Sequence, residues 1–199
     1  MKDPVSLIVC GVGGQGILVA SDVISIAALN AGFDVKKSEV HGMAQRGGAV
    51  VSAVRFGKKV YSPLVTDNEA DYILAFEKLE ALRSLPYLKK GGICIVNDYE
   101  LPTLAITLGK ETYPENIETQ LREKAGKVYI IRALDEAKKL GNPRTLNIVM
   151  VGALAKLFDH EGYGFDESAW HNALTKRIKS KYIELNLKAL RVGYELISL

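Results

Sequence analysis

The first 32 residues of the chain limit the choice of fold most strongly. Val5 to Cys10 is a short, continuous apolar run closed by glycine, which is typical of a strand buried on both faces of a parallel sheet. The glycine turn 11-GVGGQG-16 follows, and the apolar spacing of residues 17–32 predicts a helix that Gly32 ends as a C-terminal cap. Strand, glycine turn and helix in this order predict the opening of a βαβ unit.

The rest of the chain continues this pattern and then becomes helical. The predicted strands are 33–39, 49–57, 71–76, 93–96 and 127–132, and the predicted helices are 77–92 with a break near Pro86, 133–140, 145–158 and 166–181, the last continuing towards the C-terminus. Asp166 is the expected N-cap of that last helix. Residues 99–116 have no clear period and are expected to be irregular. We therefore expect an α/β fold, with a Rossmann-like, mostly parallel sheet of about six strands flanked by helices, a helical C-terminal third, and a single domain over residues 1–199.

Composition argues against several classes of protein. The formal net charge is only +3 without a block of Lys or Arg, so nucleic acid is not indicated as a partner. Cys10 and Cys94 lie in apolar runs and are expected to be buried free thiols, too few for an iron–sulfur cluster, which needs about four thiolates. His160 and His171 have no partner at a ligand spacing, so no metal site is expected. No signal peptide and no apolar window of about 18 residues occurs, so we expect a soluble, cytoplasmic protein without a membrane partner.

The turn at residues 11–16 satisfies the pattern G-x-G-x-x-G. Gly11 would ease the exit from the strand, Gly13 would allow a phosphate to approach, and Gly16 would let the helix pack closely on the strand. Tight strand-to-helix turns also use glycine without any ligand, and that explanation stays open. The pattern by itself therefore indicates a phosphate site only in combination with other features.

A dinucleotide site also needs an acidic residue about 20 positions further on, to bind the ribose hydroxyls. Glu39 is a candidate, but Lys36 and Lys37 occupy the more expected spacing and would favour a phosphate. The match to the dinucleotide pattern is therefore incomplete. A stand-alone NAD(P)-dependent dehydrogenase and a ligand-binding scaffold remain alternatives.

A second glycine-rich loop, 41-HGMAQRGG-48, follows the second predicted strand. Because both loops follow strands expected to be parallel, they should lie at the same carboxyl edge of the sheet and face each other. Together they present the carboxamides of Gln15 and Gln45, the imidazole of His41 and the guanidinium of Arg46. These groups suit a phosphorylated or carboxylated ligand better than an apolar one.

Four segments carry a resemblance to a known family. They are the G-x-G-G-Q-G turn, the string 38-SEVHGMAQRGG-48, 141-GNPRTLNIVMVGALAKL-157 and 183-IELNLKALRVGYE-195. On these residues the chain resembles the gamma-domain family of the 2-oxoacid:ferredoxin oxidoreductases, and within that family the indolepyruvate-type subunits most. The second string is the most specific of the four.

The resemblance implies a role in coenzyme A-dependent oxidative decarboxylation of a 2-oxoacid, with indolepyruvate or another arylpyruvate as the expected substrate. In such enzymes thiamine diphosphate forms the carbanion intermediate and iron–sulfur clusters pass electrons to ferredoxin. The chain lacks the cysteines for clusters and an evident G-D-G…N signature for thiamine diphosphate, so both are expected on a larger catalytic partner subunit. This chain alone is expected to be inactive, to bind no cofactor tightly, and to self-associate in isolation, with coenzyme A reaching the shared site.

The resemblance also implies roles for the residues of the two loops. The first loop is expected to approach a phosphate or the backbone of the partner, through Gly11, Gly13, Gly14, Gln15 and Gly16. The second loop is expected to line the site shared with the partner, through His41, Gln45, Arg46 and Gly47. His41 and Arg46 are the candidates for a catalytic role, although His41 capping a turn and Arg46 pairing with Glu39 are open alternatives. Asn147 and Asn186 match the family pattern without an assigned role.

Overall fold

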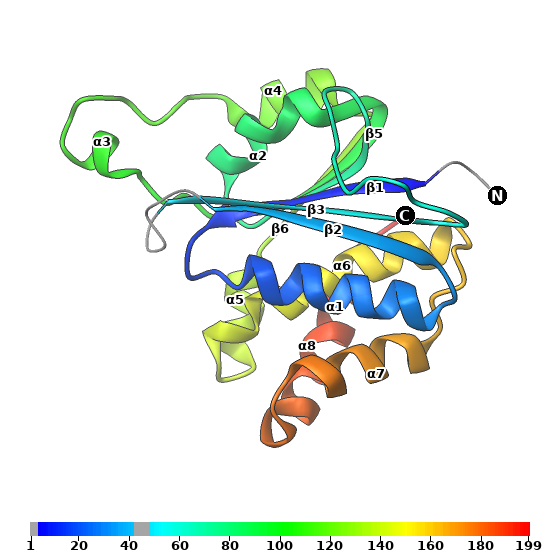
Figure 1. The fold of residues 1–199 in the computed structure, drawn as a ribbon. Coiled ribbons are helices and arrows are strands. Elements are labelled where there is room, and N and C mark those ends of the chain that lie inside the picture. Colours follow the sequence, from blue (N-terminus) through cyan, green and yellow to red (C-terminus); the bar gives the residue numbers. More distant parts are fainter. Residues whose placement is uncertain (1–3, 42–47) are drawn as a thin grey trace.

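The computed structural model describes residues 4–41 and 48–199 and contains one six-stranded sheet with helices on both faces (Figure 1). The strand order is β2-β3-β1-β4-β5-β6. The strands are β1 (Val5–Val12), β2 (Asp34–His41), β3 (Ala49–Gly57), β4 (Ala70–Ala75), β5 (Leu88–Asn97) and β6 (Lys127–Ile131). The expected α/β fold with a mostly parallel sheet of six strands is confirmed.

The sheet has a parallel part and an antiparallel part. β1, β4, β5 and β6 pair in parallel, whereas β3 is antiparallel to both β1 and β2. β1 and β2 therefore run in the same direction with β3 between them. Their carboxyl ends lie at the same edge of the sheet, as expected from the sequence.

Helices cover the two faces unequally. Figure 1 shows α2 and α4 on one face, and α1, α5, α6, α7 and α8 on the other. The helices are α1 (Ile17–Asn30), α2 (Lys78–Ser84), α3 (Leu104–Thr107), α4 (Ile117–Lys124), α5 (Ala133–Lys139), α6 (Leu146–His160), α7 (Glu167–Arg177) and α8 (Ile183–Glu195). On the second face α7 packs on α1 and α8 packs on α6.

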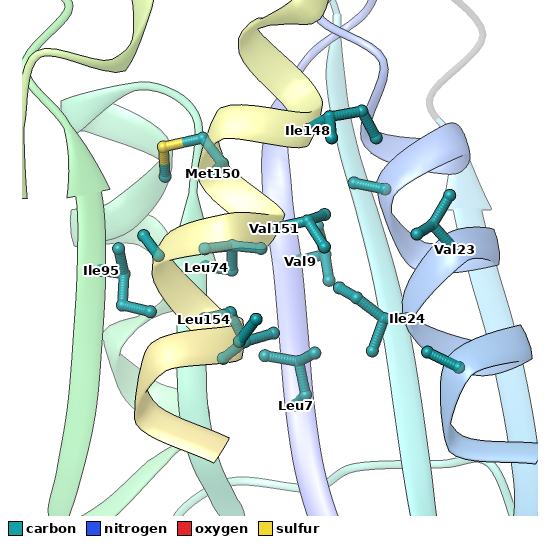
Figure 2. Close-up of a cluster of buried hydrophobic side chains, with 14 of the residues drawn as sticks. Leu7, Val9, Val23, Ile24, Leu74, Ile95, Ile148, Met150, Val151 and Leu154 are labelled. Atoms are coloured by element: carbon teal, nitrogen blue, oxygen red, sulfur yellow. The ribbon is translucent and has the colours of Figure 1, made fainter. Parts of the chain in front are cut away.

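Strand side chains alternate between two hydrophobic cores. Leu7 and Val9 of β1 point to the side of α1 and α6, where Figure 2 shows them among Ile24, Leu74 and Leu154. The intervening Ile8 and Cys10 point to the opposite core, beneath α2 and α4. The strands at the centre of the sheet are therefore mostly apolar on both faces, because both faces are buried.

Both cysteines are buried free thiols, as predicted. Burial raises the pKa of the Cys10 thiol far above its ordinary value, and it raises the pKa of Cys94 to about 12. Both thiols are therefore protonated at neutral pH and act as small core side chains.

Two local end signals are confirmed. Gly32, with a φ of 86°, ends α1: its N–H donates to Leu29 O and the N–H of Phe33 donates to Ala28 O, which is the Schellman arrangement. Asp166 caps α7 because its Oδ1 accepts a hydrogen bond from the N–H of Ala169 at 2.7 Å.

Two predicted helices are wrong, and one helix was missed. The helix predicted over 77–92 ends at Ser84, a 3₁₀ turn over Leu85–Tyr87 follows, and β5 begins at Leu88, because Pro86 cannot continue an α-helix and Leu88 pairs with Ala70 of β4. Helix α4 was not predicted. The last predicted helix is two helices, since Ile178 has extended backbone angles after α7. The segment 99–116 is irregular except for the single turn of α3, as predicted.

Candidate functional site

The two glycine-rich segments meet at the carboxyl edge of the sheet. The N–H of Gly13 donates to the carbonyl oxygen of Gly48 at 2.9 Å, just beyond the last β1–β3 pair, Val12 with Ala49. The first loop and the segment entering β3 are therefore neighbours, as the sequence predicted. That N–H already has a backbone partner.

Several predicted site residues lie outside the described residues. They are Gln45, Arg46 and Gly47 of the second loop. For His41 the structure describes only the backbone, which ends β2. The roles predicted for these four residues stay predictions.

Gln15 holds the glycine turn to the neighbouring strand. Its Oε1 accepts from the N–H of Val12 at 2.7 Å, and its Nε2 donates to the carbonyl oxygen of Phe76, just after β4, at 3.3 Å. A Cβ on Gly11 would lie 2.6 Å from that Oε1 and 2.8 Å from Cβ of Phe76. Gly11 therefore leaves room for Gln15 and Phe76, in addition to any role in leaving the strand.

Gly14 and Gly16 both have positive φ angles, 103° and 84°. Such angles favour glycine, because a Cβ would clash with the backbone. A Cβ on Gly16 would also lie 2.7 Å from Nδ2 of Asn147, which donates to the Gly16 carbonyl at 3.5 Å. The close packing expected of Gly16 is thus made with α6 rather than with β1. Asn147, whose role was open, joins α6 to the glycine turn.

The first turn of α1 is suited to an anion. Gly16 is its N-cap, no described side chain caps it, and its first turn contains no acidic residue. The backbone N–H groups at a helix start lack intrahelical partners, and the helix dipole makes this end positive. A phosphate or a partner carbonyl would be stabilised here, and Gly14 leaves the approach free of a side chain, with no atom within 4 Å of where its Cβ would lie.

The second strand does not offer a ribose site. Because β3 separates β2 from β1, the two strands are two strand spacings apart, about 10 Å, whereas the dinucleotide pattern needs them adjacent. Glu39 contacts Lys37 at 2.5 Å, and Lys37 also pairs with Asp22 of α1. Lys36 pairs with Asp34 at 3.3 Å.

Asp22 forms ion pairs with Lys37 and Arg177, and these ion pairs stabilise the fold. Burial opposes its ionisation, but hydrogen bonds from Lys37 and from Arg177 of α7, the latter at 2.6 Å, outweigh this and hold the pKa of Asp22 below its ordinary value. The two cations join β2, α1 and α7 through one carboxylate. The lysine that the spacing suggested for a phosphate is therefore committed to this cluster.

Two buried polar residues at the same edge were missed from the sequence. Asn97, fully buried at the end of β5, donates to Phe76 O at 3.2 Å and accepts from the N–H of Leu134 at 3.3 Å. Glu77, only 1% exposed, directly follows the apolar run that ends at Phe76. The detectable signal was position, because each of these polar residues directly follows a strand predicted from the sequence, 71–76 or 93–96, where side chains reach the carboxyl edge.

Beyond β4 the edge is a network of neutralised charges. Lys78 Nζ contacts Asp98 at 2.7 Å, Glu118 at 3.3 Å and Glu100 at 3.4 Å, and Arg132 contacts Asp98 at 3.5 Å. The hydrogen bond between Lys78 and Asp98 raises the pKa of Lys78 and lowers the pKa of Asp98. Acidic groups outnumber cations here, so the end of the sheet near α1 is the better place for an anion.

The described residues include no group of three or more His, Cys, Asp and Glu arranged to hold a metal ion. Within the same described ranges, no helix is long and apolar enough to cross a membrane.

Comparisons with known proteins agree on one family. The sequence profile described as pyruvate ferredoxin/flavodoxin oxidoreductase matches residues 6–196. The curated indolepyruvate oxidoreductase subunit IorB of Pyrococcus horikoshii is 40% identical over 193 residues, which cover 94% of this chain and 93% of that protein.

Solved structures with the same fold extend the comparison. The gamma subunit of keto/oxoacid ferredoxin oxidoreductase from Geobacter sulfurreducens has a TM-score of 0.70 at 24% identity, covering 96% of this chain and 97% of that chain. A chain of 2-oxoglutarate:ferredoxin oxidoreductase from Magnetococcus marinus, solved with 2-oxoglutarate, coenzyme A and succinyl-CoA, has a TM-score of 0.76 at 24% identity. That match covers 98% of this chain but only 31% of the other, so the same fold there is part of a longer polypeptide.

Proposed function

Because the chain belongs to the pyruvate ferredoxin/flavodoxin oxidoreductase family, we propose that it is a subunit of a 2-oxoacid:ferredoxin oxidoreductase acting on indolepyruvate or another arylpyruvate. The observation that carries this proposal is 40% identity to an indolepyruvate oxidoreductase subunit over 94% of the chain. The whole chain, residues 1–199, would act as one gamma-type domain of a cytoplasmic complex.

The chain would support the reaction rather than carry it out alone. It contains two cysteines, Cys10 and Cys94, both buried in the sheet, and an iron–sulfur cluster needs about four thiolates. Thiamine diphosphate and the clusters would therefore belong to a larger catalytic subunit, with ferredoxin as the electron acceptor of the complex.

The glycine turn would contribute to the shared site. Coenzyme A, when bound, supplies the thiol that receives the acyl group. Its phosphates suit the start of α1, which is capped by no side chain of the described residues and has no acid in its first turn, and Gly13 to Gly16 would border it. Gln15 would act by holding the turn, since both ends of its carboxamide are bonded to Val12 and Phe76.

The second loop would complete the site from the end of β2. Gln45, Arg46 and Gly47 would face the partner or the phosphates, and His41 and Arg46 are the candidates for a direct role in catalysis. Guanidinium groups bind phosphate and carboxylate oxygens through paired hydrogen bonds, which supports Arg46 as the main contact.

The test is reconstitution with the larger subunit from the same source under anaerobic conditions. Indolepyruvate- and coenzyme A-dependent ferredoxin reduction is expected from the pair and not from this chain alone. Turnover by the isolated chain, or no turnover by the pair, would contradict the proposal. Saturable NADH binding in titration calorimetry would instead support the stand-alone dehydrogenase, which the place of β3 in the sheet disfavours.

The loop assignment needs a matched pair of variants. Arg46→Gln is expected to raise KM for coenzyme A about tenfold or more, because a charge-assisted phosphate contact is lost. Arg191→Gln, on the exposed side of α8, removes the same charge far from the glycine turn in sequence and should leave KM unchanged. Equal KM values in both variants would exclude Arg46 from the site.

A further inference from the structure

The segment between β5 and α4, residues 98–116, forms an arm that projects beyond the sheet (Figure 1). It includes the apolar stretch 101-LPTLAITLG-109, yet none of its described side chains is buried. Leu108 is 60% exposed, and neither hydrophobic core of the described residues includes Leu101, Ile106 or Leu108. Among the described residues, the arm thus leaves the aliphatic side chain of Leu108 largely exposed, with Leu101 and Ile106 only half-buried.

One buried carboxylate ties both ends of the arm together. Oε1 of Glu77 accepts from the N–H of Leu101 at 3.1 Å and from the hydroxyl of Tyr113 at 2.5 Å. Its Oε2 caps α2 through the N–H of Glu80 at 2.9 Å. Burying a carboxylate is unfavourable unless hydrogen bonds replace its water, so these bonds hold Glu77 and both ends of the arm in one arrangement.

Lys78 fixes the start of the arm in the same region. Its backbone N–H donates to Tyr99 O at 3.0 Å, and its Nζ pairs with Asp98 and Glu100. Tyr113 also packs against the core beneath α2 and α4. The base of the arm is therefore anchored by charge and packing, while the stretch that holds Leu108 is displayed to the outside.

We propose that the arm, centred on Leu108, docks onto the larger catalytic subunit. This inference rests on the proposed function. In the Magnetococcus chain the matching fold is 31% of a longer polypeptide, so the remainder is its covalent neighbour. Here that neighbour would be a separate subunit, and the arm leaves the sheet at the same edge as the glycine turn, since β1 and β5 run in the same direction.

The test compares two exposed leucines in different loops. Leu108→Ser is expected to raise the Kd for the larger subunit about tenfold, equivalent to about 1.4 kcal/mol, because a leucine buried at the interface is lost. Leu64→Ser is the control, since Leu64 is 65% exposed but lies between β3 and β4. Both variants change exposed side chains and should fold, which circular dichroism would verify. Affinity is measured by interferometry with the full-length chain and the purified larger subunit.

A second variant tests the anchor. Glu77→Gln keeps the size of the side chain but removes the charge that Leu101 and Tyr113 bond, so weaker binding of the larger subunit is expected. Leu108→Ser remains informative if the Glu77 variant does not fold.

The outcomes separate this inference from the proposed function. If the unaltered chain binds and activates the larger subunit but Leu108→Ser binds equally well, the docking role is wrong and the proposed function stands. Binding of the larger subunit that is weakened equally by Leu64→Ser would also overturn the docking role. So would a Leu108→Ser variant that loses self-association in light scattering but binds the larger subunit as before. If the unaltered chain does not bind the larger subunit, the proposed function itself fails.

Discussion

The pairing of Gly11 with Gln15 leads to a prediction that tests how the glycine turn is built. In Gly11→Ala, the new Cβ would lie 2.6 Å from Oε1 of Gln15, about 0.8 Å short of the 3.4 Å at which ordinary van der Waals contact begins. The carboxamide must move away, and its 2.7 Å hydrogen bond from the N–H of Val12 is lost. The N–H of Val12 would then be unsatisfied, because Val12 is only 7% exposed.

The magnitude follows from these two effects. An unsatisfied buried N–H costs about 1–3 kcal/mol. Contact with Cβ of Phe76 at 2.8 Å adds an overpacking cost of about 1–3 kcal/mol. Gly11→Ala is therefore expected to lower the free energy of unfolding by about 3 kcal/mol, or the Tm by about 6–12 °C for a chain of this length.

Gln15→Ala removes the same hydrogen bond and is expected to cost about 1–2 kcal/mol. In the double variant this loss is counted once, and the space left by the glutamine side chain admits the new Cβ on Gly11. The double variant should therefore be more stable than the sum of the single effects predicts, by about 1–2 kcal/mol.

The assay is urea unfolding of the four proteins, followed by circular dichroism. Gly14→Ala is the control: its φ is 103° and no atom lies within 4 Å of its Cβ position, so it should lose about 1–3 kcal/mol through backbone strain without coupling to Gln15→Ala. Strict additivity of Gly11→Ala and Gln15→Ala would refute this account. Gly11 would then serve the turn or a ligand, independently of Gln15.

Three further predictions concern other parts of the fold. Gly193→Ala places a Cβ 1.8 Å from a backbone carbonyl of α6. The free energy of unfolding, measured with urea, is therefore expected to fall by about 2 kcal/mol even after the gain in helix propensity. Unchanged stability would contradict this backbone contact. Neither Cys10 nor Cys94 should react with Ellman's reagent at pH 8 until the protein unfolds, because both thiols are buried with raised pKa values; rapid native labelling would refute their burial. The hydrogen bond from Lys78 lowers the pKa of Asp98, so its stabilisation is present above the unfolded pKa of about 3.9 and is lost as the pH falls through the lower folded value. Asp98→Asn should thus be less stable than the original chain at pH 7, and this difference should shrink as the pH is lowered below the unfolded pKa. A difference that does not change with pH would contradict the ion pair.

Much of the fold could be predicted because its signals are local. The apolar run of β1, the glycine cap at Gly32 and the aspartate cap of α7 each depend on residues within a few positions. The boundary error at β5 and the missed helix α4 have the opposite cause. Leu88 is in a strand because Ala70 is available to pair with it, and no local pattern announces that pairing.

The candidate site divides in the same way. Its glycines and the carboxamide of Gln15 were recognisable from spacing, and the hydrogen bond between Gly13 and Gly48 shows that the first loop meets the last residue of the second. Their partners were not recognisable. Asn147 lies 131 positions from the glycine carbonyl that it contacts, and Glu77 contacts both ends of an arm that begins some 20 positions later.

The sequence by itself determined that there are six strands, the glycine turn and the family, because backbone propensity, apolar periodicity and short motifs act over a few residues. Only the tertiary structure decided that β3 enters between β2 and β1, which places β2, with Glu39, about 10 Å from β1 and removes the dinucleotide geometry. It also decided that Gln15 is held by its own chain and that Leu108 of the arm is exposed. The physical reason is that strand order and burial depend on contacts between distant segments, whose free energies appear only when the whole chain is packed.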